Sequence, residues 1–212
     1  MKIGVIGLQG AVEEHIEATK QAMRKLGVQG EVRWVSKPNE IEELDGIIIP
    51  GGESTTIGKL LVTTGLFDKI KARATDGLPI LGTCAGMILL AKEGDERTMR
   101  AGQPLLGLMD MRVIRNAFGR QRESFEVDIE IPAFGEAPFR CVFIRAPVVE
   151  RVWGDAEVLA RYLGKIVAVR QQNMLALAFH PELTQDTRAH EYFLQMCKRC
   201  PPPCTKVCYE AL

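Results

Sequence analysis

The sequence lacks long hydrophobic runs, an excess of charge of one sign, and abundant histidine. Its strongly apolar stretches reach about ten residues, whereas a helix across a bilayer needs about 20. Lys and Arg together number 27, as do Asp and Glu, so the formal net charge is zero. This balance argues against a general attraction to nucleic acid or to an anionic membrane surface. Only three histidines are present, which limits the candidates for an imidazole base.

The start of the chain shows no targeting pattern. Residues 1–7 lead directly into a charged helical pattern and lack the organisation of a secretory signal peptide. We therefore expect a cytoplasmic protein without a membrane span. A chain of 212 residues, 46% hydrophobic and 25% charged, fits one globular domain. We assign residues 1–198 to that domain and residues 199–212 to a C-terminal extension rich in Cys and Pro.

The first half of the chain alternates short apolar strands with helices. Apolar side chains recurring every three or four positions predict a helix over residues 12–26. Continuous apolar strands between helices indicate a parallel sheet that is covered on both faces. The predicted strands are residues 2–7, 31–35, 46–49 and 78–83, and further helical stretches lie at about residues 60–70 and from residue 85 to 91.

From about residue 111 the pattern changes to that of antiparallel strands. Residues 124–131 alternate apolar and charged side chains, which is typical of a strand with one buried face. The segment 163–165 (LGK) is typical of a hairpin turn. We expect this half to add its strands to the same sheet. The further predicted strands are residues 140–144, 157–162, 165–170 and 174–179, before a final helix capped by Thr184 or Asp186.

The segment 82–86 (GTCAG) stands between a predicted strand and a predicted helix. It matches a nucleophile elbow with Cys84 in the nucleophile's place. A strained strand-to-helix turn pushes the nucleophile out of the sheet's carboxyl edge, and flanking glycines avoid Cβ clashes there. The N-terminus of the next helix favours a thiolate and offers N–H groups to an oxyanion. The alternative is a buried structural cysteine, as we expect for Cys141 in the middle of a strand.

His180-Pro181-Glu182 follows the predicted strand 174–179. A histidine here can take the thiol proton and return it to leaving ammonia, while the carboxylate fixes the tautomer of the ring. His15 and His190 lie within predicted helices, so His180 alone emerges from a candidate central strand. The alternative is a strand-end histidine beside a surface glutamate. The sequence does not show that Cys84 and His180 meet, because they are far apart in the chain.

Taken together, the elbow and the His-Pro-Glu segment resemble class I, triad-type glutamine amidotransferases. Those enzymes carry a Cys-His-Glu triad on a flavodoxin-like, three-layer α/β/α fold, so the resemblance implies a mixed, mostly parallel central sheet. Further segments are similar, in the expected order from residue 1 to about 198, to the glutaminase subunits of pyridoxal 5′-phosphate synthases. They are residues 7–10 (GLQG), 50–56 (PGGESTT), 115–121 (RNAFGRQ), 124–126 (SFE), 143–147 (FIRAP) and 179–184 (FHPELT).

The resemblance implies a reaction and a partner. The chain would hydrolyse L-glutamine to L-glutamate and ammonia through Cys84, His180 and Glu182, with a thioester intermediate. Ammonia would pass through a tunnel to a separate (β/α)8-barrel synthase subunit in a multi-subunit complex. Pyridoxal 5′-phosphate (vitamin B6) would be the product of that complex, so no cofactor is expected for the glutaminase reaction. Glutaminases of this family have weak activity alone and are activated when they dock to the synthase subunit.

The resemblance also implies a set of binding residues. In the family, a Gly-Gly-Glu-Ser loop contributes to substrate binding and to the oxyanion hole, for which Gly52 and Ala85 would supply N–H groups. An arginine can grip the substrate carboxylate bidentately. Gln9 is either an interface or activation residue or an amide that stabilises its turn. The predicted substrate-binding residues are Gly52, Glu53, Ser54, Arg115, Ile144 and Arg145.

A cysteine-rich tail departs from the family pattern. Cys197, Cys200, Cys204 and Cys208 flank a run of three prolines. Their spacing leaves open a zinc or iron–sulfur site, disulfides, or thiols without a partner. No firm metal site is therefore predicted.

Three other functions fit parts of the pattern. The chain could serve a different amidotransferase, such as those of histidine, nucleotide or tryptophan synthesis. It could be a non-catalytic regulatory module that keeps the fold. A cysteine hydrolase of the related protease or chaperone type is the third, and it would place its histidine differently.

Overall fold

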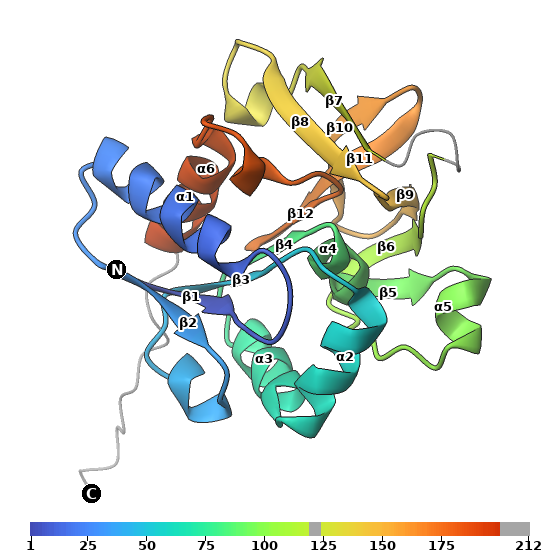
Figure 1. Ribbon diagram of the computed structural model, residues 1–212, viewed down its shortest axis with the longest axis horizontal. Helices are drawn as coiled ribbons and strands as arrows, with labels where there is room; N and C mark the ends of the chain where they lie inside the picture. Colours follow the sequence, from blue (N-terminus) through green and yellow to red (C-terminus); the bar gives the residue numbers. More distant parts are fainter. Residues whose placement is uncertain (119–123, 200–212) are drawn as a thin grey trace, which may run out of the picture.

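The computed structural model describes residues 1–118 and 124–199, and Figure 1 shows a central sheet with helices on both sides. The predicted extension from residue 200 onward, with Cys200, Cys204 and Cys208, lies outside the described residues, as do the motif positions 119–121. The boundary between residues 198 and 199 therefore stays a prediction.

Ten strands of the described chain form one mixed sheet. The strands from β2 to β12 run parallel, the pairings from β12 through β11 and β9 to β6 are antiparallel, and β5 again runs parallel to β6. In order across the sheet they are β2 (Glu31–Val35), β1 (Lys2–Ile6), β3 (Gly46–Ile49), β4 (Ile80–Thr83), β12 (Met174–Leu177), β11 (Lys165–Gln171), β9 (Val148–Val152), β6 (Met109–Ile114) and β5 (Ala91–Gly94), with β10 (Glu157–Tyr162) pairing to β11 off this path.

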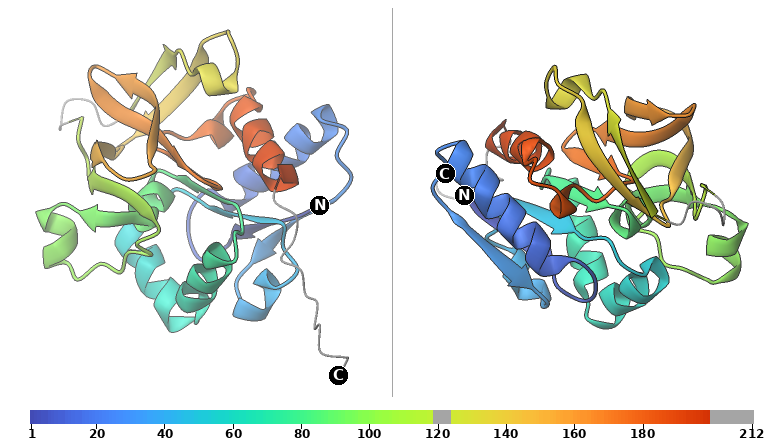
Figure 2. Two further views of the ribbon diagram at one scale, coloured as in Figure 1. Left: turned by 180° about the vertical axis from the view of Figure 1, so that it is seen from behind. Right: turned by 45° about the horizontal axis from the view of Figure 1, so that its top comes forward.

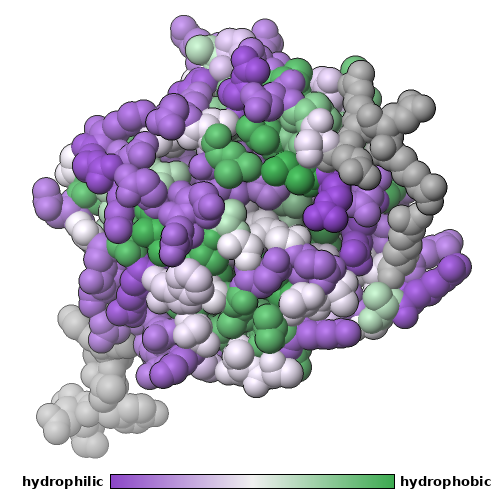
Figure 3. Space-filling view, viewed as in Figure 1, coloured by the Kyte–Doolittle hydropathy of each residue, from purple (hydrophilic) through white to green (hydrophobic). Residues whose placement is uncertain are grey.

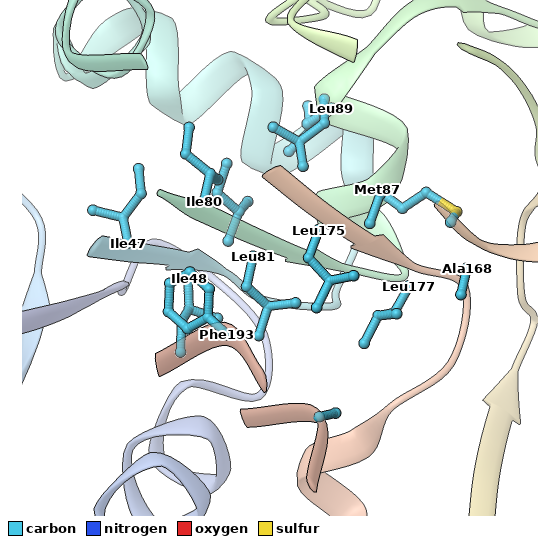
Figure 4. Close-up of a cluster of buried hydrophobic side chains, with 14 of the residues drawn as sticks. Ile47, Ile48, Ile80, Leu81, Met87, Leu89, Ala168, Leu175, Leu177 and Phe193 are labelled. Carbon is cyan, nitrogen blue, oxygen red and sulfur yellow. The ribbon is translucent and has the colours of Figure 1, made fainter. Parts of the chain in front are cut away.

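Helices cover both faces of this sheet, as Figures 1 and 2 show from three directions. Figure 4 places Leu89 and Phe193 on opposite sides of the central strands. The strands between them are apolar throughout because both of their faces are buried. The predicted α/β fold is confirmed. On one face lie α1 (Val12–Lys25) and α6 (Arg188–Arg199), and on the other α2 (Ser54–Thr63), α3 (Leu66–Thr75) and α4 (Ala85–Leu90), while α5 (Glu96–Arg100) follows β5.

Element boundaries differ from the prediction in the middle of the chain. The helical stretch around residues 60–70 is two helices, because Gly65 takes a φ of 77° between α2 and α3. Helix α4 ends at Leu90, and the next residue begins β5. The prediction missed β5, α5, β6 and β9. The predicted hairpin turn is confirmed, since Leu163 and Gly164 take φ values of 48° and 75° between β10 and β11.

β7 (Ser124–Ile129) and β8 (Phe139–Ile144) form a separate two-stranded antiparallel sheet. The prediction that all later strands extend the central sheet is therefore wrong for this pair. Its apolar face packs through rings: Phe125 stacks on Phe143 with centroids 4.8 Å apart and lies 5.6 Å from the ring of Tyr162 in β10. Alternation shows that a strand has one buried face, but it does not show which sheet the strand joins.

Figure 3 shows hydrophilic and apolar side chains interspersed over one face of the molecule. The exposed large apolar side chains Trp34, Val62, Leu163 and Leu183 lie in separate parts of the chain. Within the described residues, no helix is long and apolar enough to cross a bilayer.

Candidate active site

The strand register brings Cys84 and His180 to the same edge of the sheet. β4 and β12 are parallel neighbours, with Thr83 opposite Leu177. The Cys84 N–H donates to the Leu177 carbonyl at 2.8 Å, which continues this pairing one residue beyond β4. After β4 and β12 the polypeptide leaves the sheet at its carboxyl edge, where open α/β sheets bind ligands. Two residues distant in sequence thus meet because their strands are adjacent.

Cys84 lies at a strained turn between β4 and α4. Its φ of 48° and ψ of −98° are rare for a residue with a side chain, and such strain costs about 1–3 kcal/mol. The flanking glycines have no room for a Cβ: one on Gly82 would lie 2.7 Å from the backbone carbonyl of Gly86, and one on Gly86 would lie 2.1 Å from the Ile49 carbonyl oxygen. The segment Gly82–Gly86 therefore has the backbone of a nucleophile elbow.

His180 connects Cys84 to Glu182. Its Nδ1 lies 2.7 Å from Glu182 Oε1. Its ring is a neighbour of Cys84, since a Cβ placed on Gly51 would lie 2.4 Å from His180 Cε1 and 3.3 Å from Cys84 Cβ. With Nδ1 donating to the carboxylate, Nε2 is the ring nitrogen left for the sulfur. The backbone N–H of His180 donates to the Val142 carbonyl of β8 at 2.8 Å, so the separate two-stranded sheet helps to hold the base. Cys84 Sγ itself lies 3.9 Å from the Ile144 carbonyl oxygen.

The pKa values of His180 and Glu182 depend on each other. Burial lowers the pKa of His180, but hydrogen bonds to Cys84 and Glu182 outweigh it and raise that pKa to about 10. Burial raises the pKa of Glu182, but the neighbouring His15 and His180 outweigh it and hold that pKa below its usual value. At neutral pH the ring is therefore an imidazolium beside a carboxylate. An imidazolium at this place can protonate a leaving amine.

A cavity of about 260 Å³ opens at this edge and is large enough for an amino acid. Every predicted substrate-binding and oxyanion residue lines it, together with Cys84 and His180, whereas Glu182 lies behind His180. The lining residues are Gln9, Gly52, Glu53, Ser54, Cys84, Ala85, Ile88, Arg115, Asn116, Ile144, Arg145, Pro147 and His180.

The guanidinium of Arg115 is held on the cavity wall by polar side chains. One nitrogen donates to Gln103 Oε1 at 3.1 Å and to Thr55 Oγ1 at 3.4 Å, and another lies 3.5 Å from Glu53 Oε1. Arg145, also on the wall, has a φ of 44°, a left-handed backbone that is uncommon for a residue with a side chain. A rigidly held guanidinium facing a small cavity can bind a carboxylate.

The model of the SNO glutamine amidotransferase family matches residues 5–199. The chain belongs to this family. It is 53% identical over 196 residues to a pyridoxal 5′-phosphate synthase subunit PdxT of Archaeoglobus fulgidus, covering 92% of this chain and 98% of that protein. The PdxT subunit of Moorella thermoacetica is 56% identical over 197 residues, covering 92% and 99%.

Solved structures agree with this assignment. A crystal structure of a glutamine amidotransferase aligns with a TM-score of 0.82 at 48% identity, covering 92% of this chain and 98% of that one. A glutamine amidotransferase of Thermotoga maritima, 15% identical with a TM-score of 0.59, covers 94% and 84% and shows the shared fold alone. The α/β fold of this SNO-family chain is thus the fold of its glutamine amidotransferase neighbours.

In this SNO-family site, the side chains of the Gly-Gly-Glu-Ser loop are engaged within the protein. The Glu53 carboxylate caps α2 by accepting the N–H groups of Thr55 at 3.2 Å and Thr56 at 2.5 Å. Glu53 is therefore the N-cap of α2. The Ser54 hydroxyl is buried and donates to Gln103 at 3.1 Å. The backbone is thus what this loop can offer a substrate.

Two polar residues near the cavity escaped the sequence reasoning. Gln103 is buried and accepts hydrogen bonds from Ser54, Thr55 and Arg115, but nothing in the pattern of its loop marks it. Asn116 has a φ of 50°, and Asn tolerates that backbone better than most residues, which is the one signal it offered. Gln9 was ambiguous; its Oε1 accepts the Glu53 N–H at 2.8 Å and so tethers the loop.

The sequence left open a metal site formed by the cysteines near the C-terminus. The residues that the structure describes contain no group of three or more His, Cys, Asp or Glu side chains able to hold a metal ion. Cys197 is 4% exposed and belongs to the hydrophobic core beside β3. The other three tail cysteines lie outside the described residues, so a cluster involving them stays an open hypothesis.

His15 and His190 should make the protein less stable in mild acid. Burial lowers the pKa of His15, and it lowers that of His190 to about 3, so both stay neutral in the folded protein while the unfolded chain takes up protons below pH 6.5. Unfolding then binds protons, and stability falls by up to about 1.4 kcal/mol per pH unit for each histidine. His180, with its raised pKa, adds a slope of the opposite sign near pH 6.5, which fades toward pH 5 as the unfolded chain becomes fully protonated at this residue.

Urea unfolding between pH 6.5 and about 5, where most carboxylates stay ionised, measures this slope. His190→Gln should have a shallower slope than the unaltered protein. An equal slope in both would contradict a neutral, buried His190.

Proposed function

We propose that this chain hydrolyses L-glutamine to L-glutamate and ammonia with Cys84 as the nucleophile. The neighbouring side chains of Cys84 and His180 on the wall of an amino-acid-sized cavity, with His180 hydrogen-bonded to Glu182, carry this proposal. Membership of a glutamine amidotransferase family supports the choice of substrate.

The reaction follows from the geometry in two halves. The imidazolium of His180 already holds the proton of Cys84 and stabilises the thiolate, which attacks the side-chain amide carbon of glutamine. The resulting oxyanion accepts hydrogen bonds from backbone N–H groups, for which Gly52 and Ala85 are the candidates on the cavity wall. The imidazolium then protonates the nitrogen, ammonia leaves, and a thioester remains on Cys84.

Water completes the cycle. His180, neutral again, removes a proton from a water molecule that attacks the thioester carbonyl. Collapse of this second tetrahedral species releases glutamate, and the proton returns to the sulfur–imidazole pair. Glu182 keeps the ring in one tautomer and one orientation through both halves, because its Oε1 holds Nδ1 at 2.7 Å.

The released ammonia is a substrate of a partner synthase. Relatives at 53% and 56% identity are named pyridoxal 5′-phosphate synthase subunits, which supports the same role here rather than service to another amidotransferase. The chain is then the glutaminase subunit that supplies a (β/α)8-barrel partner, and pyridoxal 5′-phosphate is the product of the complex. The glutaminase reaction itself uses no cofactor, and the cytoplasm stays the predicted location.

Glutamate release from glutamine, measured for the chain alone and with a pyridoxal phosphate synthase barrel subunit, tests this function. We expect slow release alone, faster release in the complex, and pyridoxal phosphate when a pentose phosphate and a triose phosphate are supplied. Glutamate without pyridoxal phosphate would point to another partner. No glutamate in either mixture would contradict the catalytic proposal and favour a regulatory module.

Arg115→Lys should weaken glutamine binding. Lysine keeps the charge but not the planar fork that grips a carboxylate, and a hydrogen bond between charged groups is worth about 1.5–3 kcal/mol. The KM for glutamine should rise roughly 10- to 100-fold, converted from that energy at about 1.4 kcal/mol per factor of ten. Steady-state kinetics against Arg140→Lys, a matched change on the exposed surface of β8, makes the comparison. An unchanged KM would remove Arg115 from the binding site.

A further inference from the structure

Two buried histidines lie directly behind Glu182, on the side away from the cavity. His15 comes from α1 and His190 from α6, and both are 0% exposed. His15 Nδ1 lies 3.0 Å from His190 Nε2, and His15 Nε2 lies 2.9 Å from Thr83 Oγ1. The same Nε2 is 3.3 Å from Glu182 Oε2. The series of polar contacts that starts at Cys84 therefore continues past Glu182 into the helical layer.

The orphaned atoms of this group indicate the direction of its hydrogen bonds. Glu182 Oε2 is buried and has no hydrogen bond of good geometry, so His15 Nε2 is its nearest polar neighbour among the described contacts. His190 Nδ1 is also buried without a partner. Because His190 Nδ1 lacks a partner in either tautomer, the neighbouring carboxylate decides the direction. A proton on His15 Nε2, toward Glu182 Oε2, leaves His15 Nδ1 to accept from the Nε2 proton of His190.

The tautomers of His15 and His190 are linked. If Nδ1 of His15 accepts, its proton sits on Nε2, which points at Thr83 Oγ1 and Glu182 Oε2. The opposite tautomer would set a nitrogen lone pair 3.3 Å from a carboxylate oxygen, which is repulsive. Glu182 thus has the N–H of His180 hydrogen-bonded to Oε1, and the Nε2 side of the His15 ring faces Oε2 across an electrostatic contact of 3.3 Å.

We propose that His15 is a positioning residue for the reaction, acting through Glu182, and that His190 fixes its tautomer. The proposal rests on the function inferred for Cys84. A neutral ring whose Nε2 proton faces Oε2 at 3.3 Å favours the plane of the carboxylate that orients His180, without adding a second positive charge to the site. Glu182, His180 and Glu14 act electrostatically on His15, and His190 contacts its Nδ1. Burial outweighs the two carboxylates and lowers the pKa of His15, which keeps the ring neutral.

Three variants test the role of His15. His15→Gln can place an amide N–H near the position of Nε2, whereas His15→Leu cannot donate. Thr19→Val is the matched control: Thr19 is buried on the same helix, and its hydroxyl donates to the His15 carbonyl at 2.6 Å rather than to Glu182. Thermal unfolding of each variant shows how far a change in rate follows stability.

We expect His15→Leu to lower kcat about tenfold or more with KM changed less than about twofold, as for a lost donor to a charged group. His15→Gln should recover most of kcat, and Thr19→Val should keep it even where its melting temperature falls as far. If His15→Leu and Thr19→Val lose kcat in proportion to their melting temperatures, or if His15→Gln recovers nothing, the role is structural only.

A second readout needs no substrate. The rate of Cys84 alkylation by iodoacetamide at neutral pH reports the thiolate that the His180–Glu182 pair sustains. It should fall in His15→Leu and be restored in His15→Gln. Suppose that alkylation falls in His15→Leu and recovers in His15→Gln, but the unaltered protein releases no glutamate. That result would refute the proposed function and keep the role of His15. An unchanged alkylation rate in His15→Leu would refute the role of His15 whatever the function.

Discussion

Cys84→Ala should abolish glutamine hydrolysis, with a loss of about four orders of magnitude or more, because removing the nucleophile of a catalytic triad removes nearly all covalent catalysis. The fold should persist, since the side chain loses one atom at the cavity wall. Binding of glutamine, measured by calorimetry, should survive in the variant. Steady-state glutamate release in the complex with the synthase measures the loss.

Cys141→Ala is the matched control for this variant. Cys141 is 0% exposed in β8, and burial raises the pKa of its thiol, so it is the inert cysteine of the two. We expect this variant to lose stability, as a core truncation does, but to keep kcat. A Cys84→Ala protein that still hydrolyses glutamine at a tenth of the original rate would exclude Cys84 as the nucleophile.

Gly86→Ala is expected to have a large effect on the fold. A Cβ at this position would lie 2.1 Å from the carbonyl oxygen of Ile49 in β3, and that backbone is fixed between neighbouring strands. Overpacking against a rigid neighbour costs about 1–3 kcal/mol, and a backbone clash this short lies at the upper end or beyond it. We expect a drop in melting temperature of roughly 10 °C or more, or insoluble protein.

Gly27→Ala provides the control for Gly86→Ala. Gly27 has a φ of 60° after α1, with no atom within 4 Å of the place of its Cβ. Its replacement costs only the backbone penalty of the left-handed conformation, about 1 kcal/mol. Differential scanning calorimetry of both variants should show a clearly larger loss for Gly86→Ala. Equal losses would mean that the elbow is not tightly packed against β3.

The elbow and the parallel strands could be predicted from the sequence because their signals are local. Continuous apolar runs such as 46–49 mark strands buried on both faces, and glycines two positions on either side of Cys84 mark a turn without room for a Cβ. The membership of β7 and β8 in a second sheet could not be predicted, since it depends on the packing of Phe125 and Phe143 against Tyr162 of β10, which is distant from both in the chain.

Some residues of the candidate site could likewise be predicted from the sequence, and others could not. The triad and Arg115 stand in motifs, so sequence resemblance suggested them. Gln103, which accepts three hydrogen bonds around Arg115, stands in a loop whose path no local pattern determines. His15 sits within a helical pattern that is typical of a core side chain. Its proximity to Glu182 arises only when α1 and α6 pack on the sheet face beneath the elbow.

Covalent trapping of the nucleophile tests the catalytic role of Cys84 most directly. A glutamine analogue with a diazoketone in place of the side-chain amide alkylates the residue that attacks the amide carbon. After incubation with the complex, intact-mass and peptide mass spectrometry should find one adduct per chain, on the peptide that contains Cys84, and glutamine should protect against it. An adduct on Cys141 or Cys197, or none while glutamate is still produced, would contradict a glutaminase built on Cys84.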